Sequence, residues 1–491
     1  PNIEISAKIE PAARLRFKVK KGCQIRWKNV DIRLIHADKT VEKKANYQDI
    51  KTGAGLNHSS YEKAASELLA LQHRKGYLFA KWQEKKVLVK PESCSAEVKW
   101  AINLSKLAIV GDVSSNNSKL PSKLVSRMSG LKTGETLDPA GMTEARRSLL
   151  NTEWFQSMQL KLGEQDPTSG AIDIDIQYEL AKPNVYEWSV GYNTDRGEVV
   201  NLGWQRRYLE GTGHGLSANY QYSGTGELYS GSYTIPRATE HEIAHYFTGS
   251  FETEDIDGLR TDSTTIDWRW ALRHEGWRVT PGVGWQREIS ETDASKQTAQ
   301  TLLMKLDANH QGLDDPLWPR SGHSLDLSFQ AGPEGLLNEQ DIARFSITAG
   351  YLIPLHERWS LQLRGKYGKV WADNTDDLPT DLRFFAGGDR SVRGYSYQEL
   401  SPEDSSGTSI GGSEILVASI EPIYYFSNNW AAVAFYDVGS AYDDAPSTYP
   451  YGYGLGIRWR SPVGQIGLDL AQAEHPDYSD FRVHFRLGAA L

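Results

Sequence analysis

Residues 266–273 read Ile266-Asp267-Trp268-Arg269-Trp270-Ala271-Leu272-Arg273, with a large apolar side chain at every even position. Successive side chains of a β-strand point to opposite faces, so this stretch has one apolar face and one mostly polar face. The same alternation recurs at 325–329 and at 481–487, where arginine and histidine alternate with apolar residues. Strands of this kind need water on one side only.

Segments of this type fill the chain from residue 184 onward, and no amphipathic helix interrupts them. We count sixteen strand candidates, about 19 residues each with the following turn, which fits tilted membrane spans of roughly 9 to 11 residues plus loops. The abundant tyrosine (24), tryptophan (15) and glycine (44) suit aromatic girdles and tight turns. Alternation alone also fits a soluble sandwich, but barrel closure removes the exposed edges of so large a sheet. Residues 183–491 are therefore predicted to form a 16-stranded, all-β transmembrane barrel.

Composition and short motifs argue against several other function classes. The net charge of -9 opposes the attraction to phosphate that drives nonspecific nucleic-acid binding, so no nucleic-acid partner is expected. The stretch His241-Glu242-Ile243-Ala244-His245 matches a zinc-protease motif, but that chemistry needs a helix. Here the surroundings predict a strand, in which four residues span about 13 Å, too far for one zinc ion. We expect no catalytic group, metal or cofactor, and therefore no enzyme.

The first part of the chain contains an internal repeat. Lys51-Thr52-Gly53 recurs as Lys132-Thr133-Gly134, and each copy is followed by an amphipathic helix and then by two strands. The apolar faces of the two helices carry Tyr61, Ala64, Ala65, Leu68 and Leu71 in the first copy, and Met142, Ala145 and Leu149 in the second. The predicted α+β unit is strand, two helices, strand, strand.

These units divide the first part of the chain into three segments. Residues 1–22 resemble the closing hairpin of an incomplete first repeat, and residues 23–104 and 105–182 form the second and third repeats. Cys23 opens the first strand of the middle repeat and Cys94 opens its last strand. Parallel pairing of these strands would bring the two cysteines together, so a disulfide and two unreacted thiols both remain open.

A long polar segment, residues 372–413, lies between the eleventh and twelfth predicted strands. It contains Asp381-Leu382-Arg383-Phe384-Phe385-Ala386-Gly387-Gly388-Asp389-Arg390-Ser391-Val392-Arg393-Gly394-Tyr395. This stretch resembles the sixth-loop signature of the POTRA-plus-barrel insertase superfamily, and is most similar to the TamA family, the outer-membrane subunits of the translocation and assembly module. The resemblance implies POTRA repeats followed by a barrel.

The resemblance also implies a lock between this loop and the barrel wall. Arg393 would pair with the carboxylates Glu421 and Asp437, because a guanidinium engages carboxylates in a bidentate manner. The neighbouring residues of the predicted lock are Val392, Gly394, Tyr395, Phe435 and Gly439. The alternative for Arg393 is a solvated loop arginine.

By resemblance, the expected function is the assembly or insertion of outer-membrane proteins, including autotransporters, in a Gram-negative outer membrane. Periplasmic POTRA repeats would receive clients by strand addition, and a TamB-like, inner-membrane-anchored protein would be a partner, with the lipid bilayer around the barrel. The barrel would open along a weak lateral seam between its first and last strands. The residues predicted there are Tyr186, Trp188, Val190, Phe485, Leu487 and Gly488; Gly488 is equally compatible with an ordinary chain terminus.

Two other functions remain open. A two-partner secretion transporter would show two repeats and an N-terminal plug helix. A passive outer-membrane channel would need neither the repeats nor the loop signature, and it would show a large, steady conductance.

Overall fold

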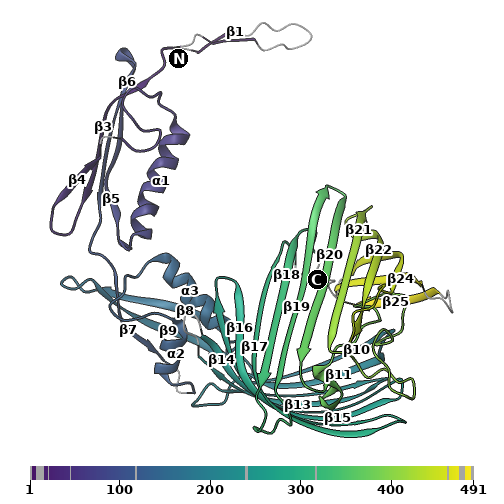
Figure 1. The fold of residues 1–491 in the computed structure, drawn as a ribbon. Coiled ribbons are helices and arrows are strands. Elements are labelled where there is room, and N and C mark those ends of the chain that lie inside the picture. Colours follow the sequence, from purple (N-terminus) through teal and green to yellow (C-terminus); the bar gives the residue numbers. More distant parts are fainter. Residues whose placement is uncertain are drawn as a thin grey trace. The chain divides into compact units, whose positions relative to one another are not determined.

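The computed structural model describes residues 3–6, 16–19, 22–44, 46–116, 119–237, 242–315, 318–461, 464–474 and 481–487. The chain forms two compact units, residues 1–179 and 180–491, and each is described by itself (Figure 1). None of the helices in these ranges is long and apolar enough to span a membrane.

The N-terminal unit begins with the antiparallel hairpin of β1 (Ile3–Ser6) and β2 (Arg16–Val19). The second repeat then forms a four-stranded sheet in the order β4-β3-β6-β5, with β3 and β6 parallel. Its elements are β3 (Arg26–Ile35), β4 (Val41–Lys44), α1 (His58–Arg74), β5 (Lys81–Lys90) and β6 (Ser95–Asn103), with a short 3-10 turn at Pro91–Ser93.

Helix α1 packs on this sheet through one apolar face. The Asn57 side chain accepts a hydrogen bond from the backbone N–H of Ser60, which satisfies one of the free donors at the helix start. The buried residues of the helix are Tyr61, Ala64, Ala65, Leu68 and Gln72. Tyr61 lies between Trp27 and Trp100 of the sheet, so the second repeat has its own aromatic core.

The second repeat differs from the predicted unit because its described residues, 23–44 and 46–104, contain one α-helix instead of two. The segment expected to hold the first helix forms strand β4, which pairs antiparallel with the end of β3. Asp38 Oδ1 accepts hydrogen bonds from the backbone N–H and the hydroxyl of Thr40, and Lys39 adopts a left-handed φ of 67°. This local turn reverses the chain directly into a hairpin, so the prediction of two helices was wrong here.

The third repeat contains both predicted helices. Its elements are β7 (Ile109–Ser115), α2 (Ser122–Ser129), α3 (Pro139–Leu150), β8 (Phe155–Gln165) and β9 (Ala171–Leu180), and its sheet has the order β7-β9-β8. Strands β7 and β9 are parallel, like their counterparts in the second repeat. Helix α3 buries Ala145 and Leu149, two of the three residues expected on its apolar face.

Cys23 and Cys94 form a disulfide, with their Cα atoms 5.9 Å apart. The parallel register of β3 and β6 pairs Arg26 with Ser95, which places the two cysteines side by side just ahead of these strands. Of the two alternatives left open by the sequence, the structure therefore contains the bonded one.

The second unit is a single antiparallel sheet of sixteen strands in sequence order, β10 to β25, and it confirms the predicted barrel. The strands are β10 (Asn184–Asn193), β11 (Gly197–Arg206), β12 (Gly215–Ser223), β13 (Gly226–Pro236), β14 (Glu242–Ile256), β15 (Leu259–His274), β16 (Trp277–Glu291), β17 (Lys296–Leu313), β18 (Gly322–Gly332), β19 (Ile342–His356), β20 (Trp359–Trp371), β21 (Glu414–Tyr425), β22 (Trp430–Tyr442), β23 (Tyr451–Ser461), β24 (Gly464–Ala473) and β25 (Phe481–Leu487).

The two faces of the barrel wall differ in polarity. Large apolar side chains are exposed on the outer face, for example Trp188, Ile266 and Leu455. Polar and charged residues such as Glu288 and Asp469 are buried on the inner face. Because an apolar outer surface of this extent is favourable in lipid, the barrel is suited to a membrane.

The two end strands, β10 and β25, approach each other. No ladder of hydrogen bonds joins them within residues 184–193 and 481–487. The described part of β25 covers seven residues, whereas β17 covers 18. We call this contact between β10 and β25 the seam.

Candidate functional site

Residues 372–413, here called the luminal loop, connect β20 to β21 and fold against the inner face of the barrel. Two 3-10 turns, Thr375–Asp377 and Thr380–Leu382, shape its first part. Its apolar side chains pack on a small apolar patch of the inner wall. The loop residues in this cluster are Leu378, Leu382, Phe384, Ala386, Val392 and Tyr395, and the wall residues are Leu303, Ile342, Val370, Ile415, Val417, Ala441 and Ala473. The loop is therefore part of the interior and not a solvated turn.

Arg393 has no exposed surface and binds both carboxylates expected from the sequence, Glu421 and Asp437. Its Nε and Nη2 atoms engage the two carboxylate oxygens of Asp437 at 2.6 and 2.9 Å, and its Nη1 lies 2.8 Å from Glu421 Oε2. The backbone N–H of Arg393 also donates to Asp437, at 3.2 Å. The planar guanidinium donates two parallel hydrogen bonds to Asp437. A lysine ammonium could not reproduce both of them.

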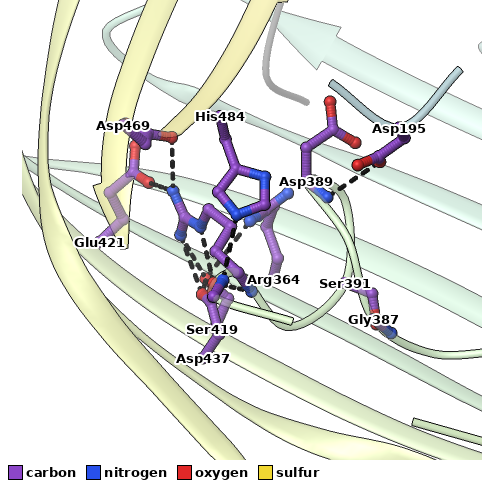
Figure 2. Close-up of polar contacts among 12 residues, drawn as sticks. Asp195, Arg364, Gly387, Asp389, Ser391, Ser419, Glu421, Asp437, Asp469 and His484 are labelled. Atoms are coloured by element: carbon purple, nitrogen blue, oxygen red, sulfur yellow. Dashed lines mark hydrogen bonds and ion pairs between the residues drawn. The ribbon is translucent and has the colours of Figure 1, made fainter. Parts of the chain in front are cut away.

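A second arginine and a third carboxylate complete the cluster, and neither was predicted as a site residue. Asp469 on β24 accepts from Arg393 Nη1 at 3.1 Å and also pairs with Arg458 on β23. Arg458 in turn bonds Glu421 at 3.2 Å. Figure 2 shows Glu421 and Asp469 on one side of this group and Asp437 with Ser419 on the other.

The cluster is close to charge balance. Arg364 on β20 donates to Ser419 Oγ at 3.4 Å, and Ser419 donates to Asp437 Oδ1 at 2.6 Å. With Arg364, three guanidinium groups face three carboxylates. This balance matters because a buried ion that loses its partner costs far more than the pair contributes.

Phe435 and Gly439 fit the same arrangement on β22. The Arg393 guanidinium carbon lies 3.5 Å from the centre of the Phe435 ring, which adds a cation–π contact. Gly439 has a φ of 147°, and a Cβ there would lie 2.1 Å from the backbone oxygen of Leu416. A larger residue at Gly439 would therefore push β22 away from β21.

The residues beside Arg393 also hold the loop. Val392 and Tyr395 are buried in the apolar cluster, and the Tyr395 hydroxyl donates to the backbone oxygen of Glu474 at 2.8 Å. The backbone N–H of Gly394 donates to His484 Nε2 on β25 at 3.1 Å. Burial raises the pKa of Tyr395 to about 12, so this hydroxyl stays protonated and keeps donating.

A second set of contacts fixes the first part of the loop to other strands. Glu288 on β16 accepts from the backbone N–H and the hydroxyl of Thr380, at 2.8 and 3.0 Å. Arg344 on β19 donates to the backbone oxygen of Leu382 at 3.0 Å, and its guanidinium stacks on Phe384. The wall residues Glu288 and Arg344 carried no motif that marked them in the sequence.

The far end of the loop is anchored as well. The Thr292 hydroxyl, in the turn between β16 and β17, donates to Asp404 at 2.7 Å. Hydrogen bonds from Ser406 and then from Thr292 lower the pKa of Asp404 to about 2, so the anchor stays ionised down to strongly acidic pH.

Residues 209–490 match the family model of the Omp85 superfamily domain, which covers more than half of the chain. The chain belongs to the Omp85 superfamily.

Individual Omp85 relatives are distant. The chain is 24% identical over 399 residues to the outer membrane protein assembly factor BamA of Nitratidesulfovibrio vulgaris, covering 76% of this chain and 50% of that protein. It is 20% identical over 548 residues to BamA of Neisseria meningitidis, covering 97% of this chain and 68% of that protein. The chain thus spans half the length of the first of these relatives.

Solved Omp85 structures share the fold. The crystal structure of BamA from Haemophilus ducreyi lacking POTRA domains 1-3 gives a TM-score of 0.74 at 16% identity, covering 89% of this chain and 94% of that one. CdiB from Acinetobacter baumannii gives a TM-score of 0.52 at 14% identity, and the match covers 95% of this chain and 90% of CdiB. These likenesses extend the Omp85 fold across nearly the whole chain.

The seam of this Omp85 barrel exposes the predicted residues of its first strand. Tyr186, Trp188 and Val190 all point outward, and Trp188 is 76% exposed. On β25, Phe485 is half-buried. The side chain of Leu487 and the whole of Gly488 lie outside the described residues, so the prediction that Gly488 weakens the closing strand stays a prediction.

The described part of the zinc-protease motif lies on a strand of this Omp85 barrel and not on a helix. Residues 242–256 are strand β14, as the surrounding sequence predicted, and His245 stacks on Trp268 and Trp270. His241 lies outside the described residues. No group of three potential ligands is found among the residues that the structure describes.

Proposed function

We propose that this chain helps fold and insert β-barrel clients, including autotransporters, into the Gram-negative outer membrane, in the manner of the TamA family. The observation that carries the proposal is the seam: a large barrel whose first and last strands lack a hydrogen-bond ladder within their described residues. Membership of the Omp85 superfamily supports the same conclusion. The proposed activity needs no catalytic group or cofactor.

An unpaired edge strand can template another strand. The backbone groups along β10 form a row of donors and acceptors that an incoming strand can satisfy. The exposed aromatic residues Tyr186 and Trp188 would contact lipid or the outward face of the client. A client hairpin could therefore pair with β10 while its apolar face enters the membrane, so that its backbone is not left unsatisfied in lipid.

The N-terminal repeats offer a second place for strand addition. Strand β5 ends the sheet of the second repeat, and β8 ends the sheet of the third. We place these repeats in the periplasm, where unfolded clients and an inner-membrane-anchored, TamB-like partner would meet them. Each of these partners is part of the proposal.

A two-partner secretion transporter is the second candidate, supported by the fold likeness to CdiB. That function passes an unfolded chain through the lumen, which the luminal loop occupies. It would require release of Arg393 from three carboxylates during every transport event. The passive channel is disfavoured by the same loop, because a channel would not need a loop anchored to the inner wall by buried ion pairs.

A reversible crosslink across the seam tests the proposed function. Cysteines are placed at Trp188 and Phe485, and the full chain is reconstituted in liposomes with an unfolded autotransporter barrel. We expect the oxidised variant to lose client insertion and a reductant to restore it, because the crosslink prevents β10 from pairing with the client.

The matched control is the unmodified chain with the same reductant, since reduction also opens the Cys23–Cys94 bond. Equal insertion by the oxidised and reduced variant would contradict the proposal. A large, steady conductance of the unmodified chain in planar bilayers would favour the passive channel instead.

A further inference from the structure

The signature segment of the luminal loop contacts the turn of the first hairpin, β10–β11, and the last strand, β25. The backbone N–H of Asp389 donates to Asp195 Oδ2 at 3.0 Å, and Asp195 lies in the turn between β10 and β11. Five residues later, the N–H of Gly394 donates to His484 on β25 at 3.1 Å. Figure 2 shows Asp195 and Asp389 facing each other, with His484 nearer the carboxylate cluster.

The contact with the first hairpin is shaped by Gly388. This residue has a φ of 96°, and a Cβ added to it would lie 2.8 Å from Asp195 Oδ2. The glycine therefore allows the carboxyl group to reach the loop backbone. Asp389 is only 8% exposed, so this is a packed contact and not a surface encounter.

We propose that the luminal loop clamps the two edge strands of the barrel, with Asp195 and His484 as the positioning residues at its two ends. The clamp rests on the proposed function, because it regulates the opening of the same seam. Arg393 lies between the two contacts and is fixed by its carboxylates. The segment 389–394 is thus a short, anchored bridge where no strand ladder joins β10 to β25 in their described residues.

The first-hairpin end of the clamp is sensitive to pH. Burial, followed by the hydrogen bond with the Asp389 carboxyl group and its negative charge, raises the pKa of Asp195 to about 7. Among the charged groups of the loop, the Asp389 carboxyl group raises this pKa and the positive charge of Arg390 lowers it. The backbone N–H of Asp389 favours the ionised form, but burial and the Asp389 carboxyl group outweigh it. The packing of Asp195 against Asp389 is therefore most favourable below pH 4, becomes less favourable as pH rises toward 7, and is least favourable above 7, where two carboxylates repel each other.

Distance measurements across the seam test the clamp. Spin labels at Val190 and Val483 report the separation of β10 and β25 in the full chain in nanodiscs, without client. Both native cysteines are bonded to each other, so labelling is specific. We expect Gly388→Ala to raise the open fraction roughly 2- to 12-fold, the range for loss of one net hydrogen bond.

Gly407→Ala is the matched control. Gly407 lies in the same loop and also has a positive φ, but no atom lies within 4 Å of a Cβ placed there. It carries the same backbone strain without touching the hairpin, so its distance distribution should equal that of the parent. Equal distributions for Gly388→Ala and Gly407→Ala would overturn the clamp.

Two further variants keep the test decisive if Gly388→Ala does not fold. Asp195→Asn retains an acceptor for the Asp389 N–H but cannot ionise, so its seam should be closed equally at pH 5 and pH 8. The parent should open more at pH 8. His484→Leu removes the acceptor of the Gly394 N–H and should open the seam at both pH values. The clamp would be overturned if Asp195→Asn kept the pH dependence of the parent and His484→Leu kept its distance distribution.

Failure of the clamp and failure of the proposed function give different results. If client addition opens the seam but the clamp variants do not change it, only the clamp is wrong. If the parent inserts the client while its seam stays closed, the proposed function is wrong.

Discussion

Arg393 meets carboxylates from three separate strands, β21, β22 and β24, so one side chain joins the luminal loop to a quarter of the barrel wall. Ion pairs at a protein surface contribute little to stability, but this group is fully buried. Its loss would leave three carboxylates around an empty site, with Arg458 as the main remaining counter-charge.

Arg393→Ala should release the loop, at a cost of roughly 3 to 5 kcal/mol for an uncompensated buried charge cluster. Arg393→Lys should not restore it, because an ammonium cannot form the bidentate pair with Asp437. Limited proteolysis of residues 372–413 in detergent measures the release.

Asp373→Ala provides the control, because Asp373 is an exposed charged residue of the same loop. It should leave loop protection unchanged. Loop protection in Arg393→Ala equal to that of the parent would contradict the lock.

The two predicted carboxylates should differ in their effect. Asp437 accepts four hydrogen bonds: two from the Arg393 guanidinium, one from the Arg393 backbone N–H and one from the Ser419 hydroxyl. Glu421, in contrast, shares Arg393 and Arg458 with Asp469. Asp437→Asn should therefore expose the loop to protease at a lower urea concentration than Glu421→Gln. The reverse order would show that Arg393 depends more on Glu421.

At the scale of elements, sequence alternation identified the strands, but it could not predict which residues of different strands meet at Arg393. Asp469 stands between Leu468 and Leu470, so its position on an inner face can be read from the sequence. Its height on the wall relative to Arg393 depends on the register of β21 to β25 and on where the loop enters. Those are properties of the closed sheet, and no single strand encodes them.

Strand β4 shows a different limit of sequence reasoning. The repeat pattern predicted a helix there, but the turn at Asp38 and Lys39 is decided by one side chain and one backbone angle. Such local chemistry overrides an analogy between repeats. The third repeat has its first helix, α2, at the corresponding place.

The disulfide should stabilise the second repeat. It joins residues separated by 71 positions, and closing a loop of that length contributes about 4 kcal/mol in the chain-entropy model. Cys23→Ser with Cys94→Ser should therefore unfold residues 22–104 at a lower urea concentration, measured by proteolysis of the full chain. The barrel should resist urea as before; a simultaneous change in both units would contradict an effect local to the repeat.

At the scale of the whole molecule, the barrel, its strand number and the connection that carries the loop followed from the sequence. Alternation and turn spacing gave the sixteen strands, and the loop signature indicated Arg393, Glu421 and Asp437. Contacts between distant segments, such as Glu288 with Thr380 and Asp389 with Asp195, had no local signal. They arise only when the loop folds inside a closed sheet.

The seam connects the chain's architecture to its proposed activity. A fully paired barrel would be more stable but would offer no edge for a client strand. Within residues 184–193 and 481–487 no hydrogen-bond ladder joins the edge strands, and in the proposed clamp the loop contacts of Asp195 and His484 hold them together. The chain would thus combine a closed resting barrel with an edge that a stronger pairing partner can take.

The most direct measurement is site-specific crosslinking between β10 and a client stalled during insertion. Single cysteines along β10, including Val190, are paired with single cysteines along the terminal strand of the client. We predict crosslinks at alternating positions in one register, with loss of the Trp188–Phe485 crosslink in the same complexes. Client crosslinks confined to the N-terminal repeats, with the seam still crosslinkable in full yield, would contradict insertion through this edge.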